Sequence, residues 1–169
     1  NESKSLKVAQ STIDSFSNFF NKEWQDMMRA KLGLTDQSAE DEVLIKDLLS
    51  WMQSKKPDFT NTFANLMDSN HANDEEFEEN DFVEWKKNWK ERVNNKDYLN
   101  IMKKTNPILI PRNYLVEEAL TEAETEGKFT KFNELLVVLS KPYEQSDIDE
   151  KYSKTPQIQA EPYKTFCGT

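Results

Sequence analysis

The sequence has few of the residues on which several kinds of site depend. Its single histidine, His71, and its single cysteine, Cys167, lie far apart, so zinc lacks a ligand set and no internal disulfide can form. The three glycines, Gly33, Gly127 and Gly168, are equally scattered, whereas a phosphate-binding loop needs several close together. We therefore expect no nucleotide loop, metal centre or disulfide within this chain.

Long apolar runs and basic clusters are also absent from the sequence. The longest apolar runs, 108–110 and 135–139, fall far short of the roughly 20 residues that a membrane-spanning helix requires. The net charge is −9 and the lysines are scattered among acidic residues, a pattern that repels phosphate backbones. Neither a membrane nor a nucleic acid is expected as a partner. The single thiol fits a reducing compartment, which favours the cytoplasm.

Composition is that of a globular protein with much polar surface. The 169 residues suffice for one domain, which would bury roughly 70% of the surface of its unfolded chain. Only 36% of the residues are apolar, whereas 31% are charged. Either the helices have broad polar faces in contact with solvent, or part of their apolar surface packs against a protein region outside this chain. We favour the second alternative. The first residue is Asn1 and not Met, so we expect a fragment of a longer protein.

Apolar residues recur at spacings of three and four, which predicts an all-α fold of about six to seven helices. The first helix should end at Gly33, the second should stop at Pro57, and Asp58 should cap the third. A later helix should run from Pro111 to Gly127. The first helix is expected to bury Leu6, Ile13, Phe16, Phe20, Trp24, Met27 and Met28. The last two are expected to bury Leu115, Val116, Ala119, Leu120 and Ala123, and then Phe132, Leu135, Leu136 and Leu139.

We divide the chain into a helical domain, residues 1–142, and a C-terminal tail, residues 143–169. Within the domain, about residues 70–81 are dominated by acids, which predicts a loop. The tail lacks helical periodicity and contains two prolines, which predicts an extended conformation.

Two sequence motifs superficially resemble functional sites. Asp58-Phe59-Thr60 is similar to the metal-binding Asp-Phe-Gly of kinases, but the preceding Pro57 and the apolar stripe after it favour a helix cap. Residues 68–79 resemble a calcium loop, yet Ala72 replaces a ligand and Asn73 stands where glycine is required. We therefore expect no catalytic, cofactor-binding or metal-binding residue here. Core packing explains the four tryptophans, Trp24, Trp51, Trp85 and Trp89.

Arg112 requires a partner. A cation in the first turn of a helix opposes the helix macrodipole by about 0.3–1 kcal/mol, so a carboxylate should compensate for it. This carboxylate lies either within the chain or in a catalytic body outside it, and we favour the first alternative. Arg112 and the adjacent Asn113 are thus candidate structural or interface residues. Cys167, near the C-terminus, is either a reactive thiol or a spectator.

Several segments resemble the selenoprotein O (SelO) family, also called UPF0061. They are NPxxIPRNxxVEEAL at residues 106–120, FxxLLxVLxxPY at residues 132–143 and the terminal TFCGT, which is similar to bacterial members. Upstream, MRAKLGL at residues 28–34, LLSWM at 48–52 and DFTNTF at 58–63 also fit. The resemblance extends over most of the chain. Ile110-Pro111 departs from the Val-Leu of many members.

This resemblance implies that the chain is the helical C-terminal portion of a protein-kinase-like fold. The complete protein would be a pseudokinase-like protein adenylyltransferase that uses ATP and Mg²⁺ or Mn²⁺ to transfer AMP to Ser, Thr or Tyr hydroxyls of proteins. Its catalytic body would precede Asn1, so this fragment should be inactive by itself. Cys167 would correspond to a selenocysteine of some members, which implies a redox link to that body. Bacterial members are expected in the cytoplasm and a eukaryotic member in mitochondria. The rival hypothesis is a non-enzymatic helical module that binds a partner protein through its aromatic stripes.

Overall fold

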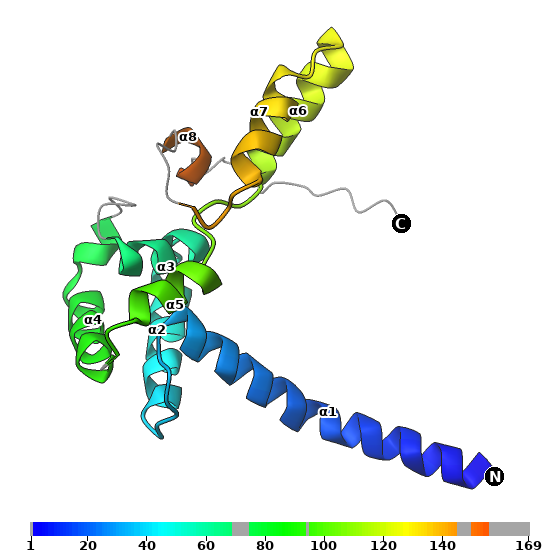
Figure 1. Cartoon of the computed structure of the whole chain (residues 1–169), viewed down its shortest axis with the longest axis vertical. Coiled ribbons are helices and arrows are strands. Elements are labelled where there is room, and N and C mark those ends of the chain that lie inside the picture. Colours follow the sequence, from blue (N-terminus) through cyan, green and yellow to red (C-terminus); the bar gives the residue numbers. More distant parts are fainter. Residues whose placement is uncertain (1, 69–74, 94, 145–149, 156–169) are drawn as a thin grey trace.

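The computed structural model describes residues 2–68, 75–93, 95–144 and 150–155. Over these residues the chain is helical and has no strand, so the predicted all-α class is confirmed (Figure 1). The elements are α1 (Glu2–Lys31), α2 (Asp41–Lys55), α3 (Phe59–Met67), the 3-10 helix η1 (Glu75–Glu78), α4 (Asn80–Arg92), α5 (Tyr98–Thr105), α6 (Asn113–Glu126), α7 (Thr130–Leu139) and α8 (Glu150–Ser153).

The larger of two apolar cores joins the C-terminal end of α1 to α2, α3, α4 and α5. Trp89 is fully buried at its centre, and its indole N–H donates to the carbonyl of Leu32 at 2.9 Å. The indole N–H of Trp85 donates to the carbonyl of Leu44 at the same distance. Because each ring is packed and each of these N–H groups is paired, the two tryptophans are structural. The prediction that the tryptophans pack in the core is confirmed, with Trp24 partly buried at its edge.

A smaller core connects α3 to the C-terminal helices. It contains five buried side chains, Ala64, Ile108, Leu109, Leu115 and Tyr152. The segment before α6 is held by the N–H of Ile108, which donates to the carbonyl of Pro142 at 2.8 Å. From there α6 and α7 lie side by side as a helical hairpin that projects from the rest of the molecule (Figure 1).

Most helix ends follow the predicted local signals, but α6 begins at Asn113 and not at Pro111, so Arg112 lies just before the helix in extended conformation. The carboxylate of Asp58 accepts the N–H of Asn61 at 2.8 Å, which caps α3 as expected. Gly33 and Gly127 have φ values of 71° and 65°, the left-handed conformation that ends many helices. At Gly33 a Cβ would lie 2.9 Å from the Cβ of Tyr98, so close packing also requires glycine there.

The prediction that the apolar stripe of the first helix is buried is wrong within this chain. Leu6, Phe16 and Phe20 are 65%, 62% and 53% exposed, whereas Met28 is 2% exposed. The reason is visible in Figure 1, where the N-terminal part of α1 extends away from the helices on which its C-terminal end packs. No described helix therefore reaches that part of the stripe.

The expected inner faces of α6 and α7 are also incomplete. Leu115 and Ala119 are buried as predicted, but Leu120 is 52% exposed. In α7, Phe132 and Leu136 are exposed and no residue is fully buried. The two helices cover each other on one side only, because the hairpin projects from the body.

Two predicted irregular segments contain helices. Part of the predicted acidic loop forms η1, and α4 begins at Asn80, because Phe77 packs its ring 5.2 Å from that of Phe82 and thereby anchors the segment. The predicted extended tail contains α8, where Tyr152 is buried in the smaller core. A helix of four residues is too short to produce a recognisable apolar period.

Candidate functional site

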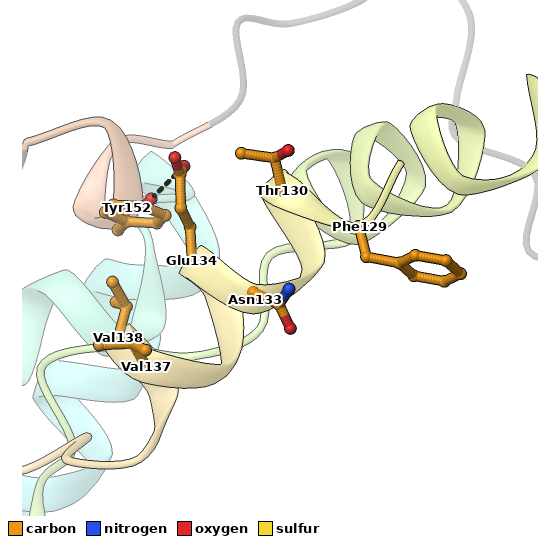
Figure 2. A pocket seen from close by; sticks show the side chains of 7 residues that line it. All are labelled: Phe129, Thr130, Asn133, Glu134, Val137, Val138 and Tyr152. Carbon is orange, nitrogen blue, oxygen red and sulfur yellow. Dashed lines mark hydrogen bonds between the residues drawn. The ribbon is translucent and has the colours of Figure 1, made fainter. Parts of the chain in front are cut away.

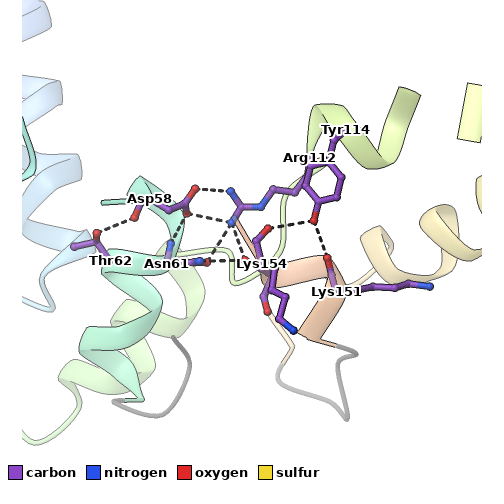
Figure 3. Close-up of polar contacts among 8 residues, drawn as sticks. Asp58, Asn61, Thr62, Arg112, Tyr114, Lys151 and Lys154 are labelled. Atoms are coloured by element: carbon purple, nitrogen blue, oxygen red, sulfur yellow. Dashed lines mark hydrogen bonds and ion pairs between the residues drawn. The ribbon is translucent and has the colours of Figure 1, made fainter. Parts of the chain in front are cut away.

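Arg112 lies where three helices meet. It is the residue that precedes α6, with φ −68° and ψ 127°, and only 7% of its surface is exposed. The sequence requires a carboxylate near this cation, and the structure supplies Asp58, at the start of α3 (Figure 3). Asn113 follows as the first residue of α6 and is exposed.

Both terminal nitrogens of the Arg112 guanidinium donate hydrogen bonds to the Asp58 carboxylate. Nη1 donates to Oδ2 of Asp58, and Nη2 donates to Oδ1 at 3.1 Å. Nη2 also lies 3.2 Å from Oδ1 of Asn61 and 3.1 Å from the carbonyl oxygen of Ser153. This bidentate arrangement is the geometry in which arginine binds a carboxylate most strongly. It ties α3, α6 and α8 together at one point, which we call the Arg112 junction.

Asp58 likewise accepts several hydrogen bonds. Besides Arg112, its side chain accepts the N–H of Asn61, and its backbone carbonyl accepts the hydroxyl of Thr62 at 2.7 Å. Burial by itself raises the pKa of the Asp58 carboxyl, but the hydrogen bonds from Arg112 and from the Asn61 N–H, with the charge of Arg112, outweigh burial. The pKa of Asp58 is therefore below its ordinary value.

Two further contacts complete the Arg112 junction. The amide nitrogen of Asn61 donates to the carbonyl of Ser153 at 3.0 Å. The hydroxyl of Tyr114 lies 2.9 Å from the carbonyl of Lys151 and 3.2 Å from that of Lys154 (Figure 3). Nε of Arg112 is buried and has no hydrogen-bond partner among the residues that the structure describes. With its carboxylate fully engaged and its cation enclosed, this cluster is suited to hold helices together and not to transfer protons.

A pocket of about 630 Å³ opens between α7 and α8 (Figure 2). Its lining residues are Phe129, Thr130, Asn133, Glu134, Val137, Val138 and Tyr152. Its two ionisable lining groups pair with each other, since the hydroxyl of Tyr152 donates to Glu134 at 3.3 Å. The remaining lining is largely apolar, which favours contact with another apolar surface over catalysis.

The remaining kinds of site considered from the sequence are a metal centre, a membrane span and a reactive cysteine. Among the residues that the structure describes, no three His, Cys, Asp or Glu side chains come together in a way that could hold a metal ion. No helix in the described part of the chain has an apolar stretch of the length that a membrane span requires. Cys167 and His71 fall outside the described ranges, so the predicted redox role of Cys167 stays a prediction.

Sequence reasoning identified both charged members of the Arg112 junction but not their pairing. Asp58 carries a helix-cap signal and Arg112 lacks a local counter-charge, yet 54 residues separate them. Asn61, Ser153 and Tyr152 were missed because each lies in a segment where neither spacing nor charge distinguishes it. The unmatched cation at the start of a helix was the one signal that pointed to the junction.

Comparison with known proteins identifies the family. The model of the family described as "Protein adenylyltransferase SelO" matches residues 4–140. The chain is 42% identical to the "Protein nucleotidyltransferase YdiU" of Clostridium perfringens (strain SM101), a match that includes all of this chain and 35% of the relative. It is 41% identical to the protein of the same name from Clostridium botulinum (strain Eklund 17B), over 97% of this chain and 34% of the relative.

The chain thus spans about a third of the length of the curated relatives that it matches. The family model, which matches residues 4–140, includes nearly all of α1 and all of α2 to α7. The Arg112 junction has its two charged residues within the matched segment. The chain therefore belongs to the SelO family of protein nucleotidyltransferases.

Proposed function

We propose that this chain is the helical C-terminal part of a protein adenylyltransferase, which transfers AMP from ATP to Ser, Thr or Tyr hydroxyls of other proteins. The observation that carries the proposal is the identity of 42% along the whole chain with a protein nucleotidyltransferase. Family membership supports nucleotide transfer, and the specific donor and acceptors belong to the proposal.

In this proposal the chain supports a kinase-like catalytic body and supplies no reacting group. ATP, Mg²⁺ or Mn²⁺, the phosphate-binding lysine and the metal-binding side chains all belong to that body. Two features of the described residues are consistent with a supporting role. The Arg112 junction rigidly connects α3, α6 and α8, and large apolar side chains of α1 and α7 face solvent. A supporting region needs helices held in fixed relative positions and an apolar surface that can pack against the catalytic body.

The position of the label in ATP tests this proposal. The complete protein is incubated with an acceptor protein and either α-labelled or γ-labelled ATP, with the metal ion present. We expect the α-label to be transferred and the γ-label not, because adenylylation retains the α-phosphate and releases pyrophosphate. The 169-residue chain is the matched control and should transfer neither label. Transfer by this chain by itself would contradict its supporting role, and failure of the complete protein would contradict the activity.

The exposed side chains of α1 also favour a second candidate, a helical module that binds another protein and has no enzymatic partner in its own chain. The coding sequence upstream of Asn1 distinguishes the two. An open reading frame with a glycine-rich loop and a kinase-like lysine supports the adenylyltransferase, whereas a start codon at that point supports the module.

Cys167 adds a regulatory element to the proposal. In the complete protein, a peroxide would oxidise its thiol and that of a second cysteine to a disulfide, with two electrons and two protons passing to the peroxide. We expect this bond to lower activity. Peptide mapping of the oxidised complete protein tests the idea, and recovery of Cys167 only as a free thiol would refute it.

A further inference from the structure

The N-terminal part of α1 presents large apolar side chains to solvent on one face. Ile13 is 66% exposed, and Phe16 and Phe20, whose rings lie 6.1 Å apart, are also exposed. The opposite face of the same turns carries Ser11, Ser15 and Asn18, and the exposed Val8 and Phe19 lie between this face and the apolar one. Several such side chains gathered along one line are unusual on an isolated soluble surface and indicate a contact face. We call the set Leu6, Ile13, Phe16 and Phe20 the α1 stripe.

The α1 stripe has the spacing of a helix–helix contact. Leu6, Ile13 and Phe20 are seven residues apart, and Phe16 lies three residues after Ile13. A repeat of seven with an intermediate position keeps apolar side chains on the seam between two packed helices. The spacing therefore points to another helix as the partner, lying along α1 for about four turns.

The stripe is continuous with the core of this chain. Further along α1, Trp24 is partly buried, and Met28 and the following Leu32 are buried in the larger core, which also contains residues of α2 and α5. The C-terminal end of α1 is thereby anchored, and the direction in which the stripe faces is set by the core. A partner that packs on the stripe would therefore extend the existing apolar core, and α1 would not have to reorient to bind it.

The size of the stripe argues against a second copy of this chain as the partner. Leu6 and Phe20 are about 21 Å apart along the helix axis, at about 1.5 Å per residue. A seam of that length and about 10–20 Å wide buries about 200–400 Å² on each partner, whereas a stable interface between separate proteins buries about 800 Å². So small a contact is sufficient when both partners belong to one polypeptide, because their effective concentration is then high.

We propose that the α1 stripe packs against a helix in the part of the longer protein that this chain does not include. The inference rests on the proposed function, since it takes the catalytic body to be that part. About two thirds of the length of the Clostridium perfringens relative lies outside the match, and the stripe lies within the segment that the family model matches. The stripe thus lies in a segment that belongs to the family, and the relative has enough further chain to cover it.

Two matched triple variants test the proposal in the complete protein. Ile13→Gln, Phe16→Gln and Phe20→Gln together remove the stripe, and Ser11→Gln, Ser15→Gln and Asn18→Gln change the opposite face equally. Hydrogen exchange of the amides of residues 5–20 is measured in both triples, in the unaltered complete protein and in the 169-residue chain. We expect these amides to exchange at least about tenfold more slowly in the complete protein than in the chain.

The stripe triple should abolish that protection and lower the melting temperature of the complete protein, while leaving that of the 169-residue chain unchanged. The control triple should preserve the protection. Equal exchange of α1 in the chain and the complete protein, or equal effects of both triples, would overturn the proposal. A concentration-dependent dimer of the chain that the stripe triple dissolves would overturn it in favour of a second copy. None of these outcomes depends on AMP transfer, so they are separable from failure of the proposed activity.

Discussion

Replacing Asp58 with alanine should destabilise this chain more than a surface substitution can. The change leaves the guanidinium of Arg112 buried without its counter-charge, and only 6% of that side chain is exposed. Breaking a buried ion pair from one side costs about 3–5 kcal/mol. Asp58 is itself 15% exposed, so partial solvation places the expected loss at the lower end of that range. Loss of the α3 cap contributes about 1 kcal/mol more.

We therefore expect Asp58→Ala to lower the free energy of unfolding by about 3–4 kcal/mol, measured by urea denaturation at pH 7 with helical circular dichroism. Asp58→Asn separates the two contributions, because asparagine caps helices as well as aspartate but carries no charge. It should recover about 1 kcal/mol relative to Asp58→Ala. A loss below about 1 kcal/mol for Asp58→Ala would refute the view that the Arg112 junction stabilises the fold.

The same variant has a pH dependence with a defined sign. Because the pKa of Asp58 is lower in the folded chain, its contribution to stability is complete above the ordinary carboxyl pKa and is lost as the pH falls through the folded value. The difference in unfolding free energy between the unaltered chain and Asp58→Ala should therefore shrink below about pH 4. A difference that grows with acidification would contradict this assignment.

Three further substitutions test other parts of the fold. Gly33→Ala should cost about 1–3 kcal/mol, since it forces φ of 71° on a residue with a Cβ; a melting temperature within 1 °C of the unaltered chain would exclude the strain. Asp41→Ala should cost about 1–3 kcal/mol, because it removes the buried carboxylate that accepts the Nε–H of Arg92 at 2.7 Å, while Asp36 stays paired with the same guanidinium; an unchanged urea midpoint would show that the Asp41–Arg92 pair contributes nothing. Leu136→Gln, on the 55% exposed side of α7, should change the unfolding free energy of this chain by less than about 0.5 kcal/mol, so a larger loss would mean that α7 is covered.

Local features of the fold were predictable because their causes lie within a few residues. Helices arise where apolar residues recur with the helical period. The helix α3 starts after Asp58, and α1 and α6 end beside Gly33 and Gly127, because capping and backbone conformation depend on neighbouring residues. The family was also recognisable from linear motifs. The helix α8 was missed, since four residues contain too little periodicity. The helix η1 was missed because Phe77, which anchors it, packs not only on Phe82 but also on Trp51, 26 residues earlier in the chain.

The sequence by itself determined that the chain is helical, where most helices begin and end, and that Arg112 must have a counter-charge. Only the tertiary structure decided that Asp58 provides this charge, because a separation of 54 residues leaves no periodic trace. It likewise decided which apolar faces are covered. The spacing of Ile13 and Phe16 shows that these side chains share a face of α1. Whether they are buried depends on another element packing against that face, and none of the described helices does so.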